Sequence, residues 1–271
     1  MKKKLALVLS IVLVVALLAG CGNAAGASKG KIRVAASPTP HAEILAFAKD
    51  LLAKEGYELE ILEYTDYVQP NLVVDSGEVD ANYFQHTPYM DQFNAENGTH
   101  IVSAGLIHYE CFGIFAGKTS SLDALPDGAK IAIPNDATNG ARALLLLQQA
   151  GILTLKDGAG IETTVYDVVD NPKNVQLIEM EAAQLPLSLQ DVDLAVINGN
   201  YALQQGLDPT ADSLAIEDAS PEVSQYFANL IGVKEGNENN EAIQALVKVL
   251  TSDEVRNFIN EKFPGTVVPV F

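Results

Sequence analysis

The chain has 271 residues, and 35 acidic against 17 basic side chains give it a formal net charge of −18 at pH 7. So much negative charge disfavours nucleic-acid backbones and anionic lipid surfaces, and we expect no nucleic-acid partner. Residues 31–271 suffice for one large or two moderate domains with cores of their own.

Residues 1–20 have the layout of a secretory signal peptide. Lysines at positions 2–4 precede an apolar run over residues 5–18, which is shorter than the ~20 residues that a membrane-spanning helix needs. Leu-Ala-Gly-Cys at residues 18–21 resembles a bacterial lipobox, so we expect cleavage before Cys21 and lipidation of its thiol. The alternative is an ordinary cleavage site. Residues 21–30 are small and polar and would form a lipidated, flexible tether to the membrane.

Strand and helix patterns alternate through the first part of the folded body. β-rich runs predict strands, and amphipathic spacing predicts helices, the last of which Thr87 would cap before Pro88. The predicted strands are residues 32–36, 59–62 and 79–84, and the predicted helices are residues 41–55, 69–76 and 87–97. Such alternation indicates an α/β sheet with ligand-contacting loops at the carboxyl ends of its strands.

The pattern changes at residues 101–116, a long β-rich stretch that we interpret as a hinge. Beyond it we predict strands over residues 130–133, 175–179, 194–197 and 229–234, helices over residues 138–150, 241–250 and 252–262, and a polar surface excursion over residues 155–174. Two chain crossings would then join two α/β lobes. We assign residues 31–114 and 230–271 to lobe I and residues 115–229 to lobe II, with a ligand cleft between them.

Four polar clusters follow predicted strands and should converge on this cleft. They are residues 66–71 (DYVQPN), 80–89 (DANYFQHTPY), 135–142 (NDATNGAR) and 197–203 (INGNYAL). Their aromatic side chains and polar tips suit a small amphiphilic ligand. The alternative for each aromatic residue alone is core packing, and for His86 a structural role. By strand alternation, Phe84 and His86 should share a face opposite Tyr83 and Gln85.

Arg142 should lie in the first turn of the helix over residues 138–150, capped by Thr138 or Asn139. Free helix amides and a guanidinium fork together suit one carboxylate, whereas an exposed helix arginine is the alternative. Asn198 and Asn200 follow a strand end, where their amides could accept from an ammonium or donate to a carboxylate. Asn-Gly-Asn is also ordinary turn chemistry, and we favour Asn198 because it lies nearer the strand.

Metal, cofactor and catalytic signatures are weak. The four histidines show no HxxxH spacing, no CxxC occurs, and no GxGxxG, Walker loop or GxSxG pentapeptide is present. Cys111 would be free, since Cys21 is expected to carry lipid, and Cys111 beside His108 is only a faint hint of a hydrolase. We expect no cofactor, no metal and no enzymatic activity. A metal-binding receptor using His86 with other histidines, and an enzyme using Cys111 and His108, are the alternatives.

These motifs resemble the methionine-binding lipoprotein family, also called the NlpA family, over essentially the whole mature chain. The resemblance rests on the lipobox, TPHAEIL at residues 39–45, the four polar clusters, NLIGVK at residues 229–234 and EKFPGTVVPVF at residues 261–271. It implies a type II periplasmic-binding fold, anchored on the extracytoplasmic side of the cell membrane, that delivers methionine to an ABC importer. The permease and ATPase subunits would be separate chains, and the body would be monomeric.

The resemblance also implies roles for single residues. Arg142 would grip the ligand carboxylate with Asn139 beside it, and Asn198, with Asn200 nearby, would hold the amino-acid head group. The residues around the thioether chain would be Tyr67, Phe84, His86 and Tyr89. Cys111-Phe112 and Ala137 depart from the family pattern near the hinge and the carboxylate loop. We expect L-methionine, with D-methionine, a methionine-containing dipeptide or another apolar amino acid as alternatives.

Overall fold

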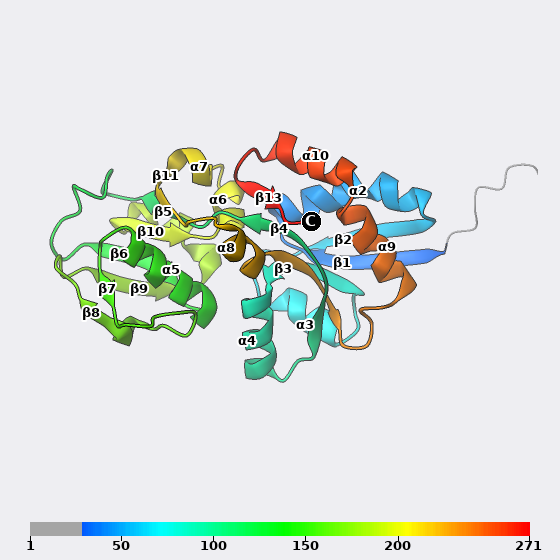
Figure 1. Ribbon diagram of the computed structural model, residues 1–271, viewed down its shortest axis with the longest axis horizontal. Helices are drawn as coiled ribbons and strands as arrows, with labels where there is room; N and C mark the ends of the chain where they lie inside the picture. Colours follow the sequence, from blue (N-terminus) through cyan, green and yellow to red (C-terminus); the bar gives the residue numbers. More distant parts are fainter. Residues whose placement is uncertain (1–28) are drawn as a thin grey trace, which may run out of the picture.

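The computed structural model describes residues 29–271, which form two large β-sheets, each packed against helices and arranged end to end along the longest axis (Figure 1). The predicted signal peptide, the lipidation at Cys21 and most of the tether lie outside the described residues. Within the described range, no helix is both long and apolar enough to cross a membrane. We call the part around the first sheet lobe I and the part around the second sheet lobe II.

Lobe I is built on a mixed sheet with the strand order β13-β4-β12-β3-β1-β2. Its strands are β1 Gly30–Ala36, β2 Tyr57–Glu63, β3 Ala81–His86, β4 Ile101–Glu110, β12 Asn229–Lys234 and β13 Val267–Pro269. β1 pairs in parallel with β2 and β3, whereas β12 is antiparallel to both β3 and β4. The returning strand β12 is therefore a central strand of the lobe.

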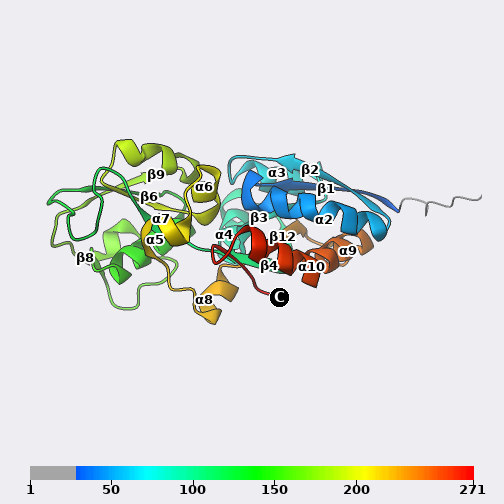
Figure 2. The ribbon, with the colours of Figure 1, turned by 90° about the horizontal axis from the view of Figure 1, so that it is seen from above.

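Helices cover both faces of this sheet, because successive strand side chains point to opposite sides. After an irregular helical turn at Pro38–Ala42, the helices are α2 Glu43–Lys54, α3 Gln69–Asp75, α4 Thr87–Asn97, α9 Glu241–Leu250 and α10 Asp253–Lys262. Val34 packs in the core under α2, α9 and α10, whereas its neighbour Ala35 packs with Val74 of α3 and Met90 of α4. Seen from above, α2 and α10 lie in front of the strands of lobe I (Figure 2).

Lobe II is built on a second mixed sheet, with the strand order β11-β5-β10-β6-β9. Its strands are β5 Gly113–Ala116, β6 Lys130–Pro134, β9 Gln176–Met180, β10 Leu194–Ile197 and β11 Ser213–Ile216, and its helices are α5 Ala137–Gln149, α6 Gly199–Gln204 and α7 Pro209–Asp212. β6 and β10 read as continuous apolar runs because they are central strands that are buried almost throughout. The polar segment 155–174 contains β8 Val168–Asp170, which pairs with β7 Thr154–Leu155 in a small sheet.

The chain passes between the lobes twice. It leaves lobe I after β4 and enters lobe II at β5, and it returns between β11 and β12 through α8 Pro221–Tyr226. The stretch over residues 101–116, expected to be a hinge, is therefore mostly two strands, one in each sheet, because its apolar residues find strand partners in both.

The two-lobed α/β prediction is confirmed. The division at residues 114/115 and 229/230 stays a prediction, and the strands place Gly113 in the second sheet and Asn229 in the first.

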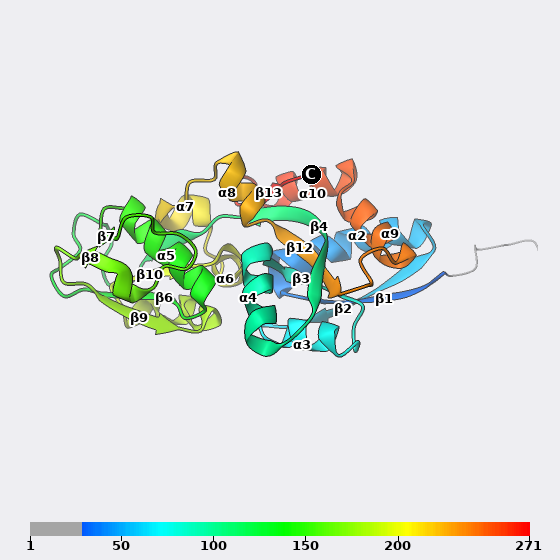
Figure 3. The same ribbon diagram turned by 60° about the horizontal axis from the view of Figure 1, so that its bottom comes forward.

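The junction between β3 and α4 differs from the prediction in two details. β3 ends at His86, two residues beyond the predicted end, and Thr87 is already helical. The N-cap is His86, whose Nδ1 accepts a hydrogen bond of 3.1 Å from the backbone N–H of Tyr89. The predicted cap at Thr87 is thus wrong, because the imidazole satisfies the free helix amide. Figure 3 shows α4 at the boundary between the two lobes, where it faces α5 and α6 of lobe II.

Candidate ligand-binding site

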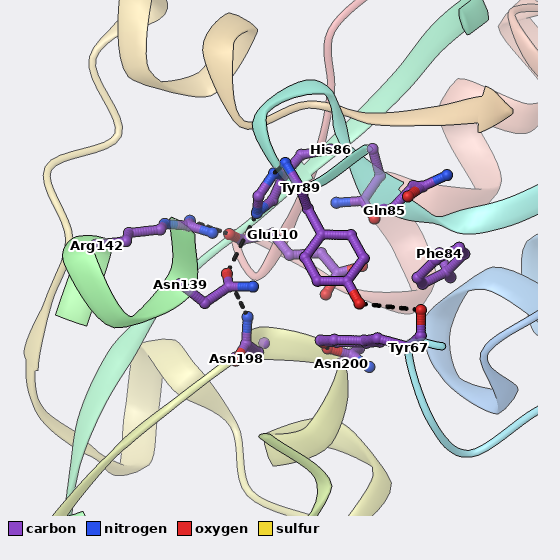
Figure 4. Close-up of a pocket in the computed structure, with 12 residues that line it drawn as sticks. Tyr67, Phe84, Gln85, His86, Tyr89, Glu110, Asn139, Arg142, Asn198 and Asn200 are labelled. Atoms are coloured by element: carbon purple, nitrogen blue, oxygen red, sulfur yellow. Dashed lines mark hydrogen bonds between the residues drawn. The ribbon is translucent and has the colours of Figure 1, made fainter. Parts of the chain in front are cut away.

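A cavity lies between the two lobes, where strand ends and helix starts of both meet (Figure 4). The side chains around it include all eight residues that the sequence predicted for a site. Its lining consists of Tyr67, Phe84, Gln85, His86, Tyr89, Glu110, Asn139, Arg142, Asn198, Gly199, Asn200 and Asn229. The convergence of the four polar clusters is therefore observed, while the ligand contacts of these residues stay a prediction.

Both lobes supply the wall of the cavity. Phe84 and His86 come from the end of β3, and Tyr89 lies one turn into α4. From lobe II, Asn139 projects from the start of α5, and Asn198 is the N-cap of α6. The carboxyl ends of strands thus face the cavity, as expected for an α/β protein.

The predicted alternation along β3 is only partly met. Tyr83 does not line the cavity, and its ring lies 4.7 Å from that of His41, but Gln85 lines the cavity together with Phe84 and His86. The cause is a register shift against β12, in which Leu230 pairs with Gln85 and the next residue, Ile231, with Tyr83. Such an irregularity breaks strict alternation, so the prediction for Gln85 was wrong.

Aromatic rings form one side of the cavity. The ring of Tyr67 lies 5.6 Å from those of Phe84 and Tyr89 and 4.9 Å from that of Tyr201. The Tyr67 hydroxyl donates to Oδ1 of Asn200 at 2.6 Å, and the Tyr201 hydroxyl donates to the carbonyl of Thr65 at 3.1 Å. These bonds join the two lobes directly across the cleft.

His86 is a neutral hydrogen-bond donor. Because its Nδ1 accepts from the amide of Tyr89, its proton lies on Nε2, which donates to Oδ1 of Asn139 at 3.2 Å. Burial lowers the pKa of His86 to about 3, and the nearby charge of Arg142 acts in the same direction. The metal hypothesis for His86 gains no support, since the group of described residues with metal-like spacing consists of His41, His108 and Glu110.

Arg142 is buried in the second turn of α5, not the first, because α5 begins at Ala137 with Asp136 as its N-cap. Asp136 accepts from the backbone N–H of Asn139 at 2.9 Å, which replaces the predicted caps Thr138 and Asn139. Asp136 is a stronger cap here because its side chain bonds the backbone of Asn139 directly.

The guanidinium fork of Arg142 is already occupied in this structure. Nε donates to Glu217 Oε1 at 2.7 Å and Nη2 to Glu217 Oε2 at 2.5 Å. The rings of Phe227 and Phe112 lie 4.3 and 4.7 Å from the guanidinium carbon. Burial alone would lower the pKa of Arg142, but the charge of Glu217 raises it above its ordinary value. The expectation of a free fork is therefore corrected: the edge formed by Nε and Nη2 binds Glu217.

A row of three asparagine side chains crosses the floor of the cavity. Asn139 Oδ1 accepts from His86 and, at 3.0 Å, from Asn198 Nδ2, while Asn139 Nδ2 donates to Asp136 at 2.9 Å. Asn198 Oδ1 and Asn200 Nδ2 are buried but have no hydrogen-bond partner among residues 29–271. One free acceptor and one free donor therefore lie in the wall of the same cavity.

The structure adds residues that the sequence analysis missed, among them Glu110, Asn229 and Gly199. Glu110 ends β4 and is 7% exposed, and Asn229 begins β12. Gly199 allows close packing, since a Cβ there would lie 2.6 Å from the carbonyl oxygen of Cys111. A carboxylate that closes a strongly β-rich run was the available sequence signal for Glu110.

The hypothetical Cys111–His108 pair is not formed. The thiol of Cys111 donates to the carbonyl of Gly265 at 3.4 Å, while the ring nitrogens of His108 bond Tyr83 and Glu110. Burial raises the pKa of Cys111 to about 11, which keeps the thiol protonated at neutral pH. The side chains thus lack the thiolate–imidazole contact that nucleophilic catalysis needs.

Comparison with known proteins places the chain among binding lipoproteins. A family model described as NlpA lipoprotein matches residues 32–271. The methionine-binding lipoprotein MetQ of Bacillus subtilis is 39% identical over 99% of both chains. The D-methionine-binding lipoprotein MetQ of Escherichia coli is 44% identical over 82% of this chain and 80% of its own. A nutrient-binding protein from Burkholderia cenocepacia, solved bound to methionine, has 44% identity and a TM-score of 0.84, covering 89% of this chain and 100% of its own.

Proposed function

The chain belongs to the NlpA lipoprotein family, and we propose that it captures methionine between its lobes and delivers it to an ABC importer. Relatives named for methionine binding and a similar structure bound to methionine support the ligand. The permease and ATPase subunits would be separate proteins, and ATP hydrolysis would occur there. A lipid on Cys21 would hold the monomeric body at the outer side of the cell membrane.

The observation that carries this proposal is the pair of unsatisfied amide atoms, Asn198 Oδ1 and Asn200 Nδ2. A buried polar atom without a partner costs about 1–3 kcal/mol, so such atoms call for a bound partner. The acceptor suits the ammonium group of an amino acid and the donor suits its carboxylate. A free amino-acid head group supplies both.

The remaining lining residues fit the rest of methionine. The rings of Tyr67, Phe84 and Tyr89 offer an apolar surface to the side chain, and sulfur–aromatic contacts stabilise a thioether by about 0.3–1.5 kcal/mol. Arg142 would contact the ligand carboxylate through Nη1, since Nε and Nη2 bond Glu217 and Nη2 also bonds the carbonyl of Glu110, with Asn139 beside it. We propose L-methionine as the ligand, with D-methionine, a methionine-containing dipeptide or another apolar amino acid as alternatives.

Mass spectrometry of ligand released by denaturing the purified protein tests the proposal directly, because a closed cleft retains its ligand. We expect methionine. Isothermal titration of the stripped protein against L-methionine, D-methionine, glycylmethionine and leucine should rank L-methionine first. Failure of every methionine-containing ligand to bind below millimolar concentration would reject the proposal.

A variant test addresses the unsatisfied acceptor. Asn198→Leu keeps the branching of the side chain but removes Oδ1 together with the Nδ2 donor to Asn139, so we expect methionine affinity to fall by 1–3 kcal/mol, roughly 5- to 150-fold. Asn239→Leu on the exposed surface is the control and should bind as the parent does. Unchanged affinity in Asn198→Leu would remove Asn198 from the site.

A further inference from the structure

Two of the hydrogen bonds between the lobes use no residue of the cavity lining. The backbone N–H of Thr138, in the first turn of α5, donates to Oε1 of Gln92 on α4 at 3.1 Å. The hydroxyl of Tyr201 on α6 donates to the carbonyl of Thr65, between β2 and α3, at 3.1 Å. In each bond the donor belongs to lobe II and the acceptor to lobe I. Both bonds must therefore break when the lobes move apart.

Gln92 completes the N-terminus of α5 from the opposite lobe. A helix begins with backbone N–H groups that have no partner within the helix, and Thr138 carries one of them. The N-cap Asp136 accepts from the next amide, that of Asn139, so the bond of the Thr138 amide depends on Gln92. Separation of the lobes would return this N–H to water. One of the helix amides expected to be free for a ligand carboxylate thus binds lobe I instead.

The orientation of the Gln92 amide is fixed within α4. Its Nε2 donates to Oε1 of Glu96, one turn further along the helix, at 2.7 Å. With the nitrogen held by this carboxylate, Oε1 of Gln92 faces the N–H of Thr138, which needs an acceptor. The opposite orientation would place an amide donor against a backbone donor. Glu96 is therefore a positioning residue for the contact across the cleft.

Tyr201 makes its contact from a rigid position in lobe II. It is 4% exposed and packs in a core cluster with Ile197, so its ring is held while its hydroxyl reaches Thr65. Its ring lines an outer groove that also includes Asp66 of lobe I and Asp136 of lobe II. Burial raises the pKa of Tyr201, so its hydroxyl stays protonated and donates at neutral pH.

We propose that Gln92 and Tyr201 form a latch that stabilises the closed form of the protein without contacting the ligand. The inference goes beyond the proposed function, because it concerns lobe closure and takes methionine only as a probe. Each hydrogen bond should shift the open–closed equilibrium by about 2- to 12-fold. A ligand that binds the closed form loses affinity in proportion when that form is less populated. The latch therefore sets how long any ligand is held, while the cavity lining selects the ligand.

Hydrogen–deuterium exchange of the ligand-stripped full chain tests the latch without any ligand. The amide of Thr138 reports on closure, because its bond crosses the cleft. Tyr201→Phe leaves Gln92 intact but removes the other latch bond, so we expect the Thr138 amide to exchange about 2- to 12-fold faster in this variant. An unprotected Thr138 amide in the parent, or equal exchange in parent and Tyr201→Phe, would overturn the inference.

Binding of several ligands separates a latch from a ligand contact. We expect Gln92→Met and Tyr201→Phe each to weaken methionine affinity by about 2- to 12-fold, mainly through faster dissociation. L-methionine, D-methionine and any other ligand that binds should lose the same factor, because closure is common to all of them. A loss confined to one ligand would place the side chain against that ligand and overturn the inference, as would unchanged affinity in both variants.

Matched controls come from the surface of each lobe. Gln244 is a helical glutamine whose side chain bonds the carbonyl of Glu238 within lobe I, and Tyr166 is 92% exposed in lobe II. Gln244→Met and Tyr166→Phe should bind and exchange as the parent does. Glu96→Gln keeps an acceptor for Gln92 and should stay close to the parent, whereas Glu96→Ala should show part of the loss of Gln92→Met.

The two tests also separate the latch from the proposed ligand. Faster exchange of the Thr138 amide in Tyr201→Phe, without methionine binding to the parent, would keep the latch and reject the ligand. Normal methionine binding with unchanged exchange and affinity in Gln92→Met and Tyr201→Phe would keep the ligand and reject the latch.

Discussion

The most consequential contact at the residue scale is the ion pair of Arg142 and Glu217. It is buried, with side-chain exposures of 5% and 11%, and the hydroxyl of Tyr109 donates a further bond of 2.6 Å to Glu217. Breaking a buried pair by removing one partner leaves an uncompensated charge, which costs more than the pair itself contributes. The pair thus fixes the guanidinium beside the cavity and links α5 to the chain segment that returns to lobe I.

Removing one member of this pair should therefore destabilise the protein more than removing both. We expect Arg142→Ala to lower the free energy of unfolding by roughly 3–5 kcal/mol, because Glu217 is left buried and unpaired. The double variant Arg142→Ala with Glu217→Ala should lose less than Arg142→Ala alone, and so less than the sum of the single losses. Urea denaturation of the four proteins measures this, and strictly additive losses would contradict the assigned pairing.

At the scale of the element, α5 carries two of the predicted ligand contacts, and its N-terminus determines where they point. Asp136 bonds the backbone and side chain of Asn139 at 2.9 Å each and receives the hydroxyl of Thr138 at 3.3 Å. Asn139 in turn holds His86 and Asn198. One capping residue thus connects the helix start to both lobes.

Loss of this cap should affect stability and binding together. Asp136→Ala removes the acceptor for the Asn139 amide, and we expect a loss of about 0.5–2 kcal/mol in unfolding free energy. Methionine affinity should also fall, because Asn139 is freed to rotate. Asp136→Asn keeps a cap and should retain most of the stability. Thermal unfolding and titration of both variants provide the check, and a normal affinity in Asp136→Ala would separate the cap from the site.

At the scale of the whole molecule, ligand entry depends on the separation of the lobes, and folding depends on the charge state of buried histidines. The cavity measures only about 20 Å³ in this structure, so the lobes must move apart to admit a ligand as large as an amino acid. Three histidines are buried, at 0–6% exposure: His86 lines the cavity, and His41 and His108 lie behind Glu110 in lobe I. Burial is the first cause of their lowered pKa values, so the folded form depends on their being neutral.

Acid should consequently destabilise the folded chain before its carboxylates titrate. The pKa is about 4 for His41 and about 3 for His86 and His108 in the fold, against an ordinary value near 6.5. The unfolded chain thus binds more protons below about pH 6.5, and each histidine removes up to about 1.4 kcal/mol of stability per pH unit as the pH falls from there toward its folded pKa. Denaturant unfolding at pH 7.5, 6.5 and 5.5 measures this, and His86→Gln should flatten the slope. A flat profile in the parent would contradict neutral burial.

Local sequence patterns determined the helices and strands of this protein and the position of its cavity. The periods of strands and helices, with Gly and Pro at their ends, gave the elements and the two-lobed α/β organisation. The positions of polar clusters after strands gave the eight predicted residues around the cavity, from Tyr67 to Asn200. These features were readable because periodicity and strand-end position depend on neighbours within a few residues.

Tertiary structure alone decided which distant side chains meet. Arg142 and Glu217 are 75 positions apart, and the local sequence around either residue does not predict their contact. His41, in the turn before α2, meets His108 and Glu110 near the end of β4. Asn229 bonds His41 because β12 lies between β3 and β4. Charge pairing depends on strand order and lobe contact, which local periodicity does not encode. The sequence therefore determined where the cavity lies, and the fold decided which of its charges remain free for a ligand.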